Sequence, residues 1–274
     1  WVMLPIMDGF AKYLSAELPV LQITWARYFF TVVFIFPLML FFFKKYLVWT
    51  DKPKLQLIRG LILLTANISF FYSISVISLP KALTLAFVAP LVVTAFSPFF
   101  LGESVGYRRW AAVIIGFIGS LVVIRPGFLE INLASLAALG TGIMYGFYLI
   151  ITRKLSTSDN PLLTLLLTGV VGAIIATTFM PFVWVSPTFN QWSIMAAIGL
   201  FACIGHLFII LSLKYADASK LAPFSYFEIV TNIIIAYYFF GDFPDSWTFL
   251  GLFIIVFSGI YISRRENIVK KIKI

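Results

Sequence analysis

The feature that most constrains this chain is a series of roughly ten apolar runs, most of them long enough to cross a lipid bilayer as a helix. They cover residues 1–15, 19–43, 55–77, 80–101, 106–124, 132–153, 161–184, 191–213, 218–240 and 245–264. The 274 residues are 61% hydrophobic and only 11% charged, which is far outside the composition of a soluble domain. The sequence therefore predicts an all-α polytopic membrane protein with ten transmembrane helices.

The runs are expected to be helices and not strands of a barrel. A barrel strand alternates apolar and polar residues over about ten positions, whereas residues 61–64 and 252–257 are apolar on every side. The first run is an exception in length, because its residues rise about 22 Å against a hydrocarbon core of about 30 Å. We therefore expect the start of this helix to lie upstream of residue 1.

The distribution of Lys and Arg predicts the orientation in the membrane. With the N-terminus inside, sixteen of the twenty Lys and Arg fall in cytoplasmic loops, Arg59 among them, while only Lys81 and Arg125 lie on the other side. Lys12 and Arg27 fall within apolar runs. The net charge of +9 therefore orients helices in membrane lipid and does not indicate a nucleic-acid partner. We expect a bacterial inner (plasma) membrane protein with both termini cytoplasmic.

A weak internal repeat divides the chain into residues 1–127 and 128–274. At a shift of 139 residues, Gly60 aligns with Gly199, Asn67 with His206, and residues 100–103 with 239–242. In the first pair of helices the shift is about 141. Each half would contain five helices, an odd number, so the two halves must enter the membrane from opposite sides. Inverted repeats of this kind are typical of alternating-access transporters, although duplicated halves can also serve stability alone.

Several short motifs resemble a known family. They are Arg27 in the second run, residues 82–99 with Pro90, residues 102–103 before the fifth run, residues 8–14 (DGFAKYL), residues 59–60, 216–218, 222–223 and 226–228. In these motifs the chain resembles the drug/metabolite transporter superfamily, EamA type. Within this superfamily it is most similar to S-adenosylmethionine uptake carriers. The resemblance implies a central cavity lined by spans 1, 3, 4, 6, 8 and 9, with spans 5 and 10 at the periphery.

Glu228 is the best functional candidate, because a bare charge in hydrocarbon costs several kcal/mol unless something uses it. It lies about ten residues into its run, hence about 15 Å deep, and Asn232 follows one turn later on the same face. The carboxylate could bind a substrate ammonium or sulfonium, or carry a coupling proton. It could also be a protonated acid that bonds a neighbouring helix.

Further polar and aromatic residues lie in mid-span positions on other runs. His206, Asn67 and Phe71 are candidates for the cavity lining, and His206 could instead form a helix-to-helix hydrogen bond. Tyr145 and Tyr148 are spaced to stack on a planar or cationic ligand. Tyr226 is a candidate as well, since mid-span phenols usually have hydrogen-bond partners.

Two charged positions near the N-terminus are open to a structural and a functional interpretation. Asp8 and Lys12 are spaced i, i+4, which permits an intrahelical ion pair for which a substrate or proton could compete. Arg27 is expected to be a structural anchor, whose long stem reaches toward the outer surface or toward Glu17. Pro90 frees the carbonyl of the residue four positions earlier, so its helix is expected to be kinked and to serve in gating.

These residues predict a secondary transporter that moves a small zwitterionic or amine-bearing metabolite, similar to S-adenosylmethionine or an amino acid, by alternating access. Proton coupling and exchange are both open, and an exporter of amino acids or drug-like metabolites is the alternative. A channel and an intramembrane enzyme belong to other classes. One His, one Cys, no GxSxG and no GxxxxGK[ST] leave little material for catalysis, metal binding or ATP hydrolysis. We expect no cofactor, a small-molecule substrate as partner, and leave a homodimer open.

Overall fold

The computed structural model describes residues 2–47, 50–102, 105–125, 132–156, 158–215 and 218–272, without the side chains of 101, 218–227, 263 and 265–272. All regular elements in these ranges are helices. They are α1 (Met3–Leu14), α2 (Val20–Phe42), the short η1 (Lys44–Tyr46), α3 (Pro53–Val76), α4 (Leu79–Ala86), α5 (Ala89–Leu101), α6 (Tyr107–Ile124), α7 (Leu133–Leu155), α8 (Pro161–Val183), α9 (Phe189–Tyr215), α10 (Ala218–Phe240) and α11 (Ser246–Ile272).

The helix boundaries agree with the predicted spans to within a few residues, apart from the longer C-terminal end of α11. Within the described residues, seven segments are long and apolar enough to cross a membrane when α4 and α5 are counted together as Leu79–Phe100. Shorter apolar helices follow at Glu228–Phe240 and Ser246–Ile262. The protein is therefore an all-α polytopic membrane protein, as its hydrophobic runs predict.

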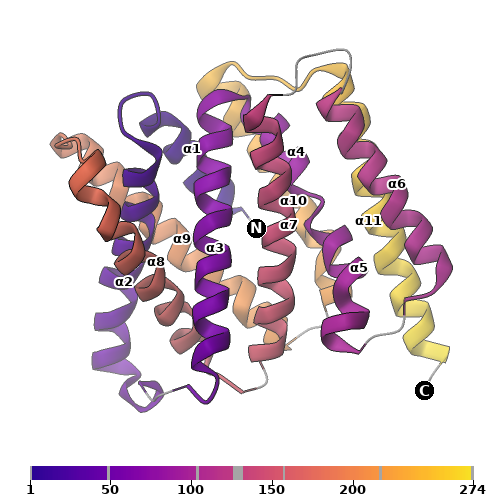
Figure 1. Cartoon of the computed structure of the whole chain (residues 1–274), viewed down its shortest axis with the longest axis horizontal. Coiled ribbons are helices and arrows are strands. Elements are labelled where there is room, and N and C mark those ends of the chain that lie inside the picture. Colours follow the sequence, from indigo (N-terminus) through magenta and orange to yellow (C-terminus); the bar gives the residue numbers. More distant parts are fainter. Residues whose placement is uncertain are drawn as a thin grey trace.

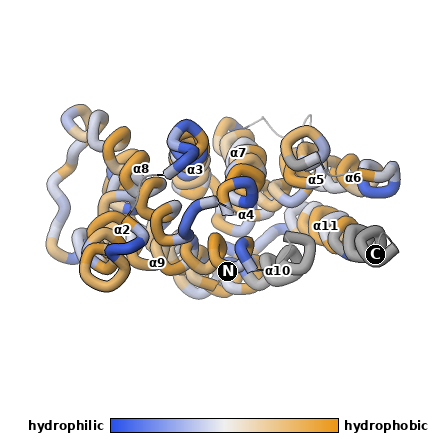
Figure 2. Tube along the Cα trace, turned by 90° about the horizontal axis from the view of Figure 1, so that it is seen from below, coloured by the Kyte–Doolittle hydropathy of each residue, from blue (hydrophilic) through white to orange (hydrophobic). Residues whose placement is uncertain are grey.

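The helices form two rows (Figures 1 and 2). One row contains α8, α3, α7, α5 and α6 in that order, and the other contains α2, α9, α1, α10 and α11, while α4 lies between the rows against α7 and α10. The middle of the two rows thus consists of α3, α7 and α4 facing α9, α1 and α10. These are the six helices that the resemblance assigns to a central cavity, and α6 and α11 lie together at one end.

At both ends of the rows, helices of the two halves pack antiparallel against each other. The indole Nε1 of Trp25 on α2 donates to Oγ1 of Thr177 on α8 at 2.9 Å. At the other end, a methyl group at Gly119 of α6 would come within 2.9 Å of Cγ2 of Ile254 on α11. These two contacts, α2 with α8 and α6 with α11, join the helices that the repeat alignment sets against each other.

The fourth span is broken in the middle, where the sequence predicts only a kink. α4 ends at Ala86, Phe87 departs from helical backbone angles while Val88 keeps them, and α5 begins at Ala89 with Pro90 in its first turn. Because Pro90 has no N–H, it cannot bond the carbonyl of Ala86. That carbonyl instead faces Gly142 of α7, where a Cβ atom would lie 2.5 Å from its oxygen. The glycine therefore lets the break pack closely on α7.

One end of the bundle is named here the Lys12 face. At this face α1, α3, α6, α8 and α10 end, and α2, α4, α7, α9 and α11 begin. The connection from α10 to α11 runs along the upper edge of Figure 1, and the C-terminus lies at the lower edge. Gly241, at the end of α10, has a left-handed backbone with φ of 66°, and the aligned Gly102, at the end of α5, has φ of 67°.

Candidate functional site

A continuous chain of polar side chains crosses the space between the two rows. Nη2 of Arg59 on α3 donates to the phenol oxygen of Tyr148 on α7 at 2.7 Å. The same oxygen lies 3.2 Å from Nδ1 of His206 on α9. Nε2 of His206 in turn lies 2.6 Å from Nη2 of Arg27 on α2. Because all four side chains are buried, the chain joins four helices in the interior of the bundle.

The partners of His206 fix its protonation state. An arginine N–H can only donate, so Nε2 of His206 must accept the hydrogen bond from Arg27. The ring is then neutral and carries its proton on Nδ1, from where it donates to Tyr148. A second proton on the ring would replace this acceptor with a donor that faces a guanidinium. The contact between Arg27 and His206 therefore exists only while the imidazole is neutral.

Arg59 is not a cytoplasmic loop cation, as the count of loop charges assumed. α3 begins at Pro53, so Arg59 lies in its second turn, with no exposed surface. Nε donates to Oγ1 of Thr152 at 2.8 Å, and Nη1 donates to the carbonyl of Thr164 at 3.2 Å and to Oγ1 of Thr168. With Tyr148, this gives the guanidinium neutral oxygen acceptors from α7 and α8. These acceptors take the place of the water molecules that would hydrate the guanidinium of a loop residue.

Arg27 is not the surface anchor that the sequence predicts. Its side chain is only 2% exposed, and its guanidinium carbon lies 4.7 Å from the centre of the Tyr28 ring, a cation–π contact. Nε lies 3.4 Å from the sulfur of Met7. Glu17, the expected partner, instead accepts a hydrogen bond from Nε2 of Gln191 at 2.5 Å. The long stem of Arg27 therefore reaches into the bundle and not toward the membrane surface.

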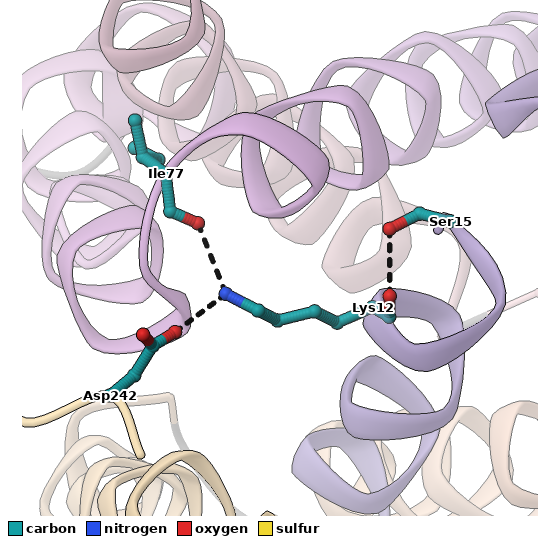
Figure 3. Close-up of polar contacts among 4 residues, drawn as sticks. All are labelled: Lys12, Ser15, Ile77 and Asp242. Atoms are coloured by element: carbon teal, nitrogen blue, oxygen red, sulfur yellow. Dashed lines mark hydrogen bonds and ion pairs between the residues drawn. The ribbon is translucent and has the colours of Figure 1, made fainter. Parts of the chain in front are cut away.

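The predicted ion pair between Asp8 and Lys12 is also wrong. Nζ of Lys12 lies 2.6 Å from Oδ2 of Asp242 and donates to the carbonyl of Ile77 at 3.4 Å, as Figure 3 shows. Asp8 is 3% exposed and follows Met7, whose sulfur lies 3.4 Å from Nε of Arg27. The i, i+4 spacing allows a local pair, but the segment after α10 and the α3–α4 turn bring Asp242 and the Ile77 carbonyl to Lys12 instead.

Unpaired polar atoms lie near Glu228. Glu228 on α10 is partly exposed, and one turn later Asn232 has no exposed surface. In the described part of the chain, neither amide atom of Asn232 has a hydrogen-bond partner, and the same holds for the phenol of Tyr145. Tyr145 stacks on Tyr148 with ring centres 5.4 Å apart and planes at 18°, and it interacts electrostatically with Glu228. Buried polar groups without partners are rare and point to water or a ligand.

The remaining sequence candidates lie around this centre. Asn67 on α3 donates from Nδ2 to the phenol of Tyr28 at 2.7 Å and to the carbonyl of Leu63 at 2.6 Å, so its amide is part of the polar network. Phe71, one turn later, is 1% exposed within the main apolar core. The side chain of Tyr226 lies outside the described residues.

Among these candidates, the contacts connect Tyr145, Tyr148 and His206 directly, and Arg27, which contacts His206, also contacts Met7 next to Asp8. Arg27 and Arg59 belong to the same centre, although sequence reasoning assigned them to the surface. Residues 59–60 did appear among the family-like motifs, which is the one sequence signal for Arg59. In the part of the chain that the structure describes, no group of three or more His, Cys, Asp or Glu side chains could hold a metal ion.

Comparison with known proteins identifies the family. The description "EamA-like transporter family" matches residues 6–125 and again residues 132–264, which together are most of the chain. The chain belongs to the EamA-like transporter family. The family and its transporter relatives make this protein a transporter and not an enzyme.

Relatives of this EamA-like transporter have different cargoes and directions. It is 27% identical to an S-adenosylmethionine uptake transporter of Rickettsia bellii, with 97% of this chain and 91% of the relative covered. It is 25% identical to a pseudopaline exporter of Pseudomonas aeruginosa, covering 96% and 92%. A riboflavin transporter of Vibrio cholerae is 28% identical over 68% of this chain and 63% of the relative. A solved structure at 16% identity shares the fold with a TM-score of 0.69 over 96% of both chains.

Proposed function

We propose that this EamA-like transporter is a secondary carrier for a small zwitterionic or amine-bearing metabolite, such as S-adenosylmethionine or an amino acid. The observation that supports this most is the charge arrangement in the middle of the two rows. Asp8 and Glu228 lie on α1 and α10, which pack against each other, and Arg27 on α2 contacts Met7, the residue next to Asp8. A site with both signs of charge favours a cargo that also carries both signs.

Each group in the centre has a separate role in this proposal. Asp8 and Glu228 bind a substrate ammonium or sulfonium, since a desolvated cation needs a carboxylate beside it. Arg27, whose direct hydrogen bonds go to neutral groups, supplies the cation for a substrate carboxylate. Tyr145, stacked on Tyr148, offers an aromatic face for a planar part of the cargo. The unpaired phenol of Tyr145 and amide of Asn232 supply hydrogen bonds to its polar atoms.

S-adenosylmethionine has all the chemical parts that such a site would recognise. It combines a sulfonium, an amino-acid group and an adenine ring, and S-adenosylmethionine uptake is what the name of the Rickettsia bellii relative describes. An amino-acid-like cargo with the same charged groups but no large ring is the alternative. The pseudopaline exporter among the relatives favours export as a second candidate direction, because side chains alone do not determine which way a carrier runs.

The carrier mechanism that we propose is alternating access between two inverted halves. Two observations support it: the family description matches the two halves of the chain separately, and α2 packs on α8 and α6 on α11 across the two rows. Inverted repeats place the substrate site near the membrane midplane between the halves. With both termini cytoplasmic in a bacterial inner membrane, the Lys12 face is the outer face.

A thermal-shift screen on the purified protein tests the substrate class. A ligand stabilises the folded state by RT ln(1 + [L]/Kd), so a true substrate at saturating dose raises the melting temperature. We expect S-adenosylmethionine, or an amino acid, to raise it, whereas anionic sugars and phosphates leave it unchanged. A rise with anionic ligands alone would contradict the proposed class.

The variant Glu228→Gln identifies the role of the carboxylate, and Glu17→Gln is the matched control at the Lys12 face. We expect Glu228→Gln to abolish the ligand shift and Glu17→Gln to keep it. If Glu228→Gln binds normally but loses pH-dependent uptake into proteoliposomes, the carboxylate carries the coupling proton instead. Normal binding and normal uptake in Glu228→Gln would remove the residue from the site.

A further inference from the structure

Three chain segments meet at Lys12 on the Lys12 face (Figure 3). Lys12 is near the end of α1, Ile77 lies in the turn between α3 and α4, and Asp242 follows the end of α10. Nζ of Lys12 lies 2.6 Å from the Asp242 carboxylate and 3.4 Å from the Ile77 carbonyl oxygen. One ammonium group therefore joins α1 to the end of α10 in its own row and to the opposite row.

The backbone holds both partners of this ion pair in place. Gly241 adopts a left-handed conformation that ends α10, and the N–H of Asp242 donates to the carbonyl of Ala236 at 3.0 Å. At the other partner, the hydroxyl of Ser15 donates to the carbonyl of Lys12 at 2.7 Å. The ring of Phe240 lies 5.3 Å from Nζ of Lys12 and adds a cation–π contact.

The exposure of the pair suits a contact that breaks and re-forms. The side chains of Lys12 and Asp242 are 17% and 28% exposed, so water reaches both groups and can replace the contact when they separate. A fully buried pair would resist separation, because each charge would lose its partner without gaining water. A fully exposed pair would contribute little to closure.

The pair is close to the proposed substrate site. Asp8 lies one turn before Lys12 on α1, so the two side chains share a face of the helix. Any shift of α1 that a substrate causes through Asp8 also moves Lys12. Separation of α1 and the end of α10 from the α3–α4 turn would break the contacts that Lys12 makes.

We propose that Lys12, Asp242 and the Ile77 carbonyl form a latch that keeps the Lys12 face closed and opens once in each transport cycle. The proposal rests on the alternating-access function proposed above. The latch belongs to the closed state of this face. Its opening exposes the central site to that side of the membrane, and its re-formation closes the site again.

A second ion pair on the same face provides a matched control. Arg125, at the end of α6, pairs with Asp245, just before α11. These helices lie at the end of the rows and pack against each other along their length, with Gly119 and Gly251 at the contact. The pair involves neither α1 nor the α3–α4 turn. Loss of this pair should leave closure of the Lys12 face unchanged.

Accessibility of a single cysteine tests the latch without any substrate. Ala11→Cys, in a Cys203→Ser background, places a thiol at a position on α1 that is 1% exposed. We expect Lys12→Met and Asp242→Asn each to raise its labelling by a membrane-impermeant maleimide several-fold from the Lys12 side. The swap of Lys12→Asp with Asp242→Lys should return labelling toward the starting rate. Arg125→Met should leave it unchanged.

The outcomes separate the latch from the proposed function. Unchanged labelling in Lys12→Met and Asp242→Asn, a swap that fails to restore closure, or an equal effect of Arg125→Met overturns the latch. Lys12→Met should keep the thermal shift given by the substrate while its uptake rate falls. A screen that finds no zwitterionic ligand overturns the proposed substrate class and leaves the labelling result standing, because labelling is measured without ligand.

Discussion

Two polar regions in the interior of the bundle differ in how completely their hydrogen bonds are made. Around Arg59, the guanidinium donates to oxygen atoms of Tyr148, Thr152, Thr164 and Thr168 from two neighbouring helices. Around Glu228, both amide atoms of Asn232 and the phenol of Tyr145 have no hydrogen-bond partner in the described structure. The two regions are joined through the stacked rings of Tyr145 and Tyr148.

The difference indicates which polar residues serve structure and which are available for a ligand. A buried polar group without a partner costs about 1–3 kcal/mol, and a saturated network costs little. Each nitrogen of the Arg59 guanidinium has an oxygen acceptor from the protein, so we assign this group to holding α3, α7 and α8 together. The Glu228 region leaves hydrogen bonds to be completed by water or cargo. Substitutions around Arg59 should therefore affect stability more than transport. Substitutions around Glu228 should affect transport more than stability.

Arg59→Met should have the largest effect. The substitution removes the donor from four buried oxygen acceptors at once, so we expect a loss of at least about 3 kcal/mol of stability. Thermal unfolding and size-exclusion profiles of the purified variant measure it. Arg108→Met is the control, because Arg108 is exposed at the start of α6 and its side chain bonds only the neighbouring Tyr107 in the described contacts. A stable, active Arg59→Met protein would contradict the structural assignment.

Asn232→Leu should have the opposite effect, with a smaller magnitude. Leucine has a similar size and removes two buried atoms that lack partners, so the ligand-free protein should gain about 1–3 kcal/mol of stability. The same change should weaken the substrate-dependent thermal shift and slow uptake. Thr231→Leu is unsuitable as a control because Thr231 has contacts of its own. Ile233→Leu, at the position after Asn232 on α10, is the matched control and should change neither the stability nor the uptake. Destabilisation by Asn232→Leu would show that the amide is satisfied in the folded protein.

Pro90→Ala should change stability least and rate most. The alanine N–H can bond the carbonyl of Ala86 and extend α4 into α5, which removes the break that packs on Gly142. If the α4–α5 break bends during transport, we expect the turnover of uptake to fall while the substrate affinity from thermal shift stays the same. Pro98→Ala, nearer the end of α5, is the control. Unchanged uptake kinetics in Pro90→Ala would remove the gating role.

The sequence predicts the helices well, because hydrophobic length alone determines a membrane span. It also predicts that Pro90 disturbs its helix, since a missing N–H is a local property of one residue. It fails for the partners of charged residues. The i, i+4 spacing permits a pair of Lys12 with Asp8, whereas its actual partner, Asp242, is brought to it by the packing of α1 and α10. Such a long-range contact leaves no periodic signal in a single chain.

Arg59 and Arg27 are further charged residues whose partners the sequence does not reveal. Arg59 lies near the start of the predicted span 55–77, so a count of charges at the span ends assigns it to the cytoplasmic side. Its oxygen acceptors on α7 and α8 are far away in the sequence and give no local signal. Arg27 was expected to extend to the membrane surface, because a side chain with no visible partner should seek water. Its partner His206 lies far along the sequence on α9. Proposed roles for Asp8, Glu228 and the tyrosines remain predictions for the experiments above.

The packing of α6 on α11 has a consequence for the order in which this protein is made. α6 completes the first half of the chain, yet α11, the helix that covers it, is synthesised only after α7, α8, α9 and α10. During biosynthesis α6 must wait in lipid, or beside the insertion machinery, until the whole second half has been inserted. A chain that stops before α11 would leave this helix uncovered. Such a chain would be an incomplete bundle exposed to quality-control proteases, and not a working carrier of smaller size.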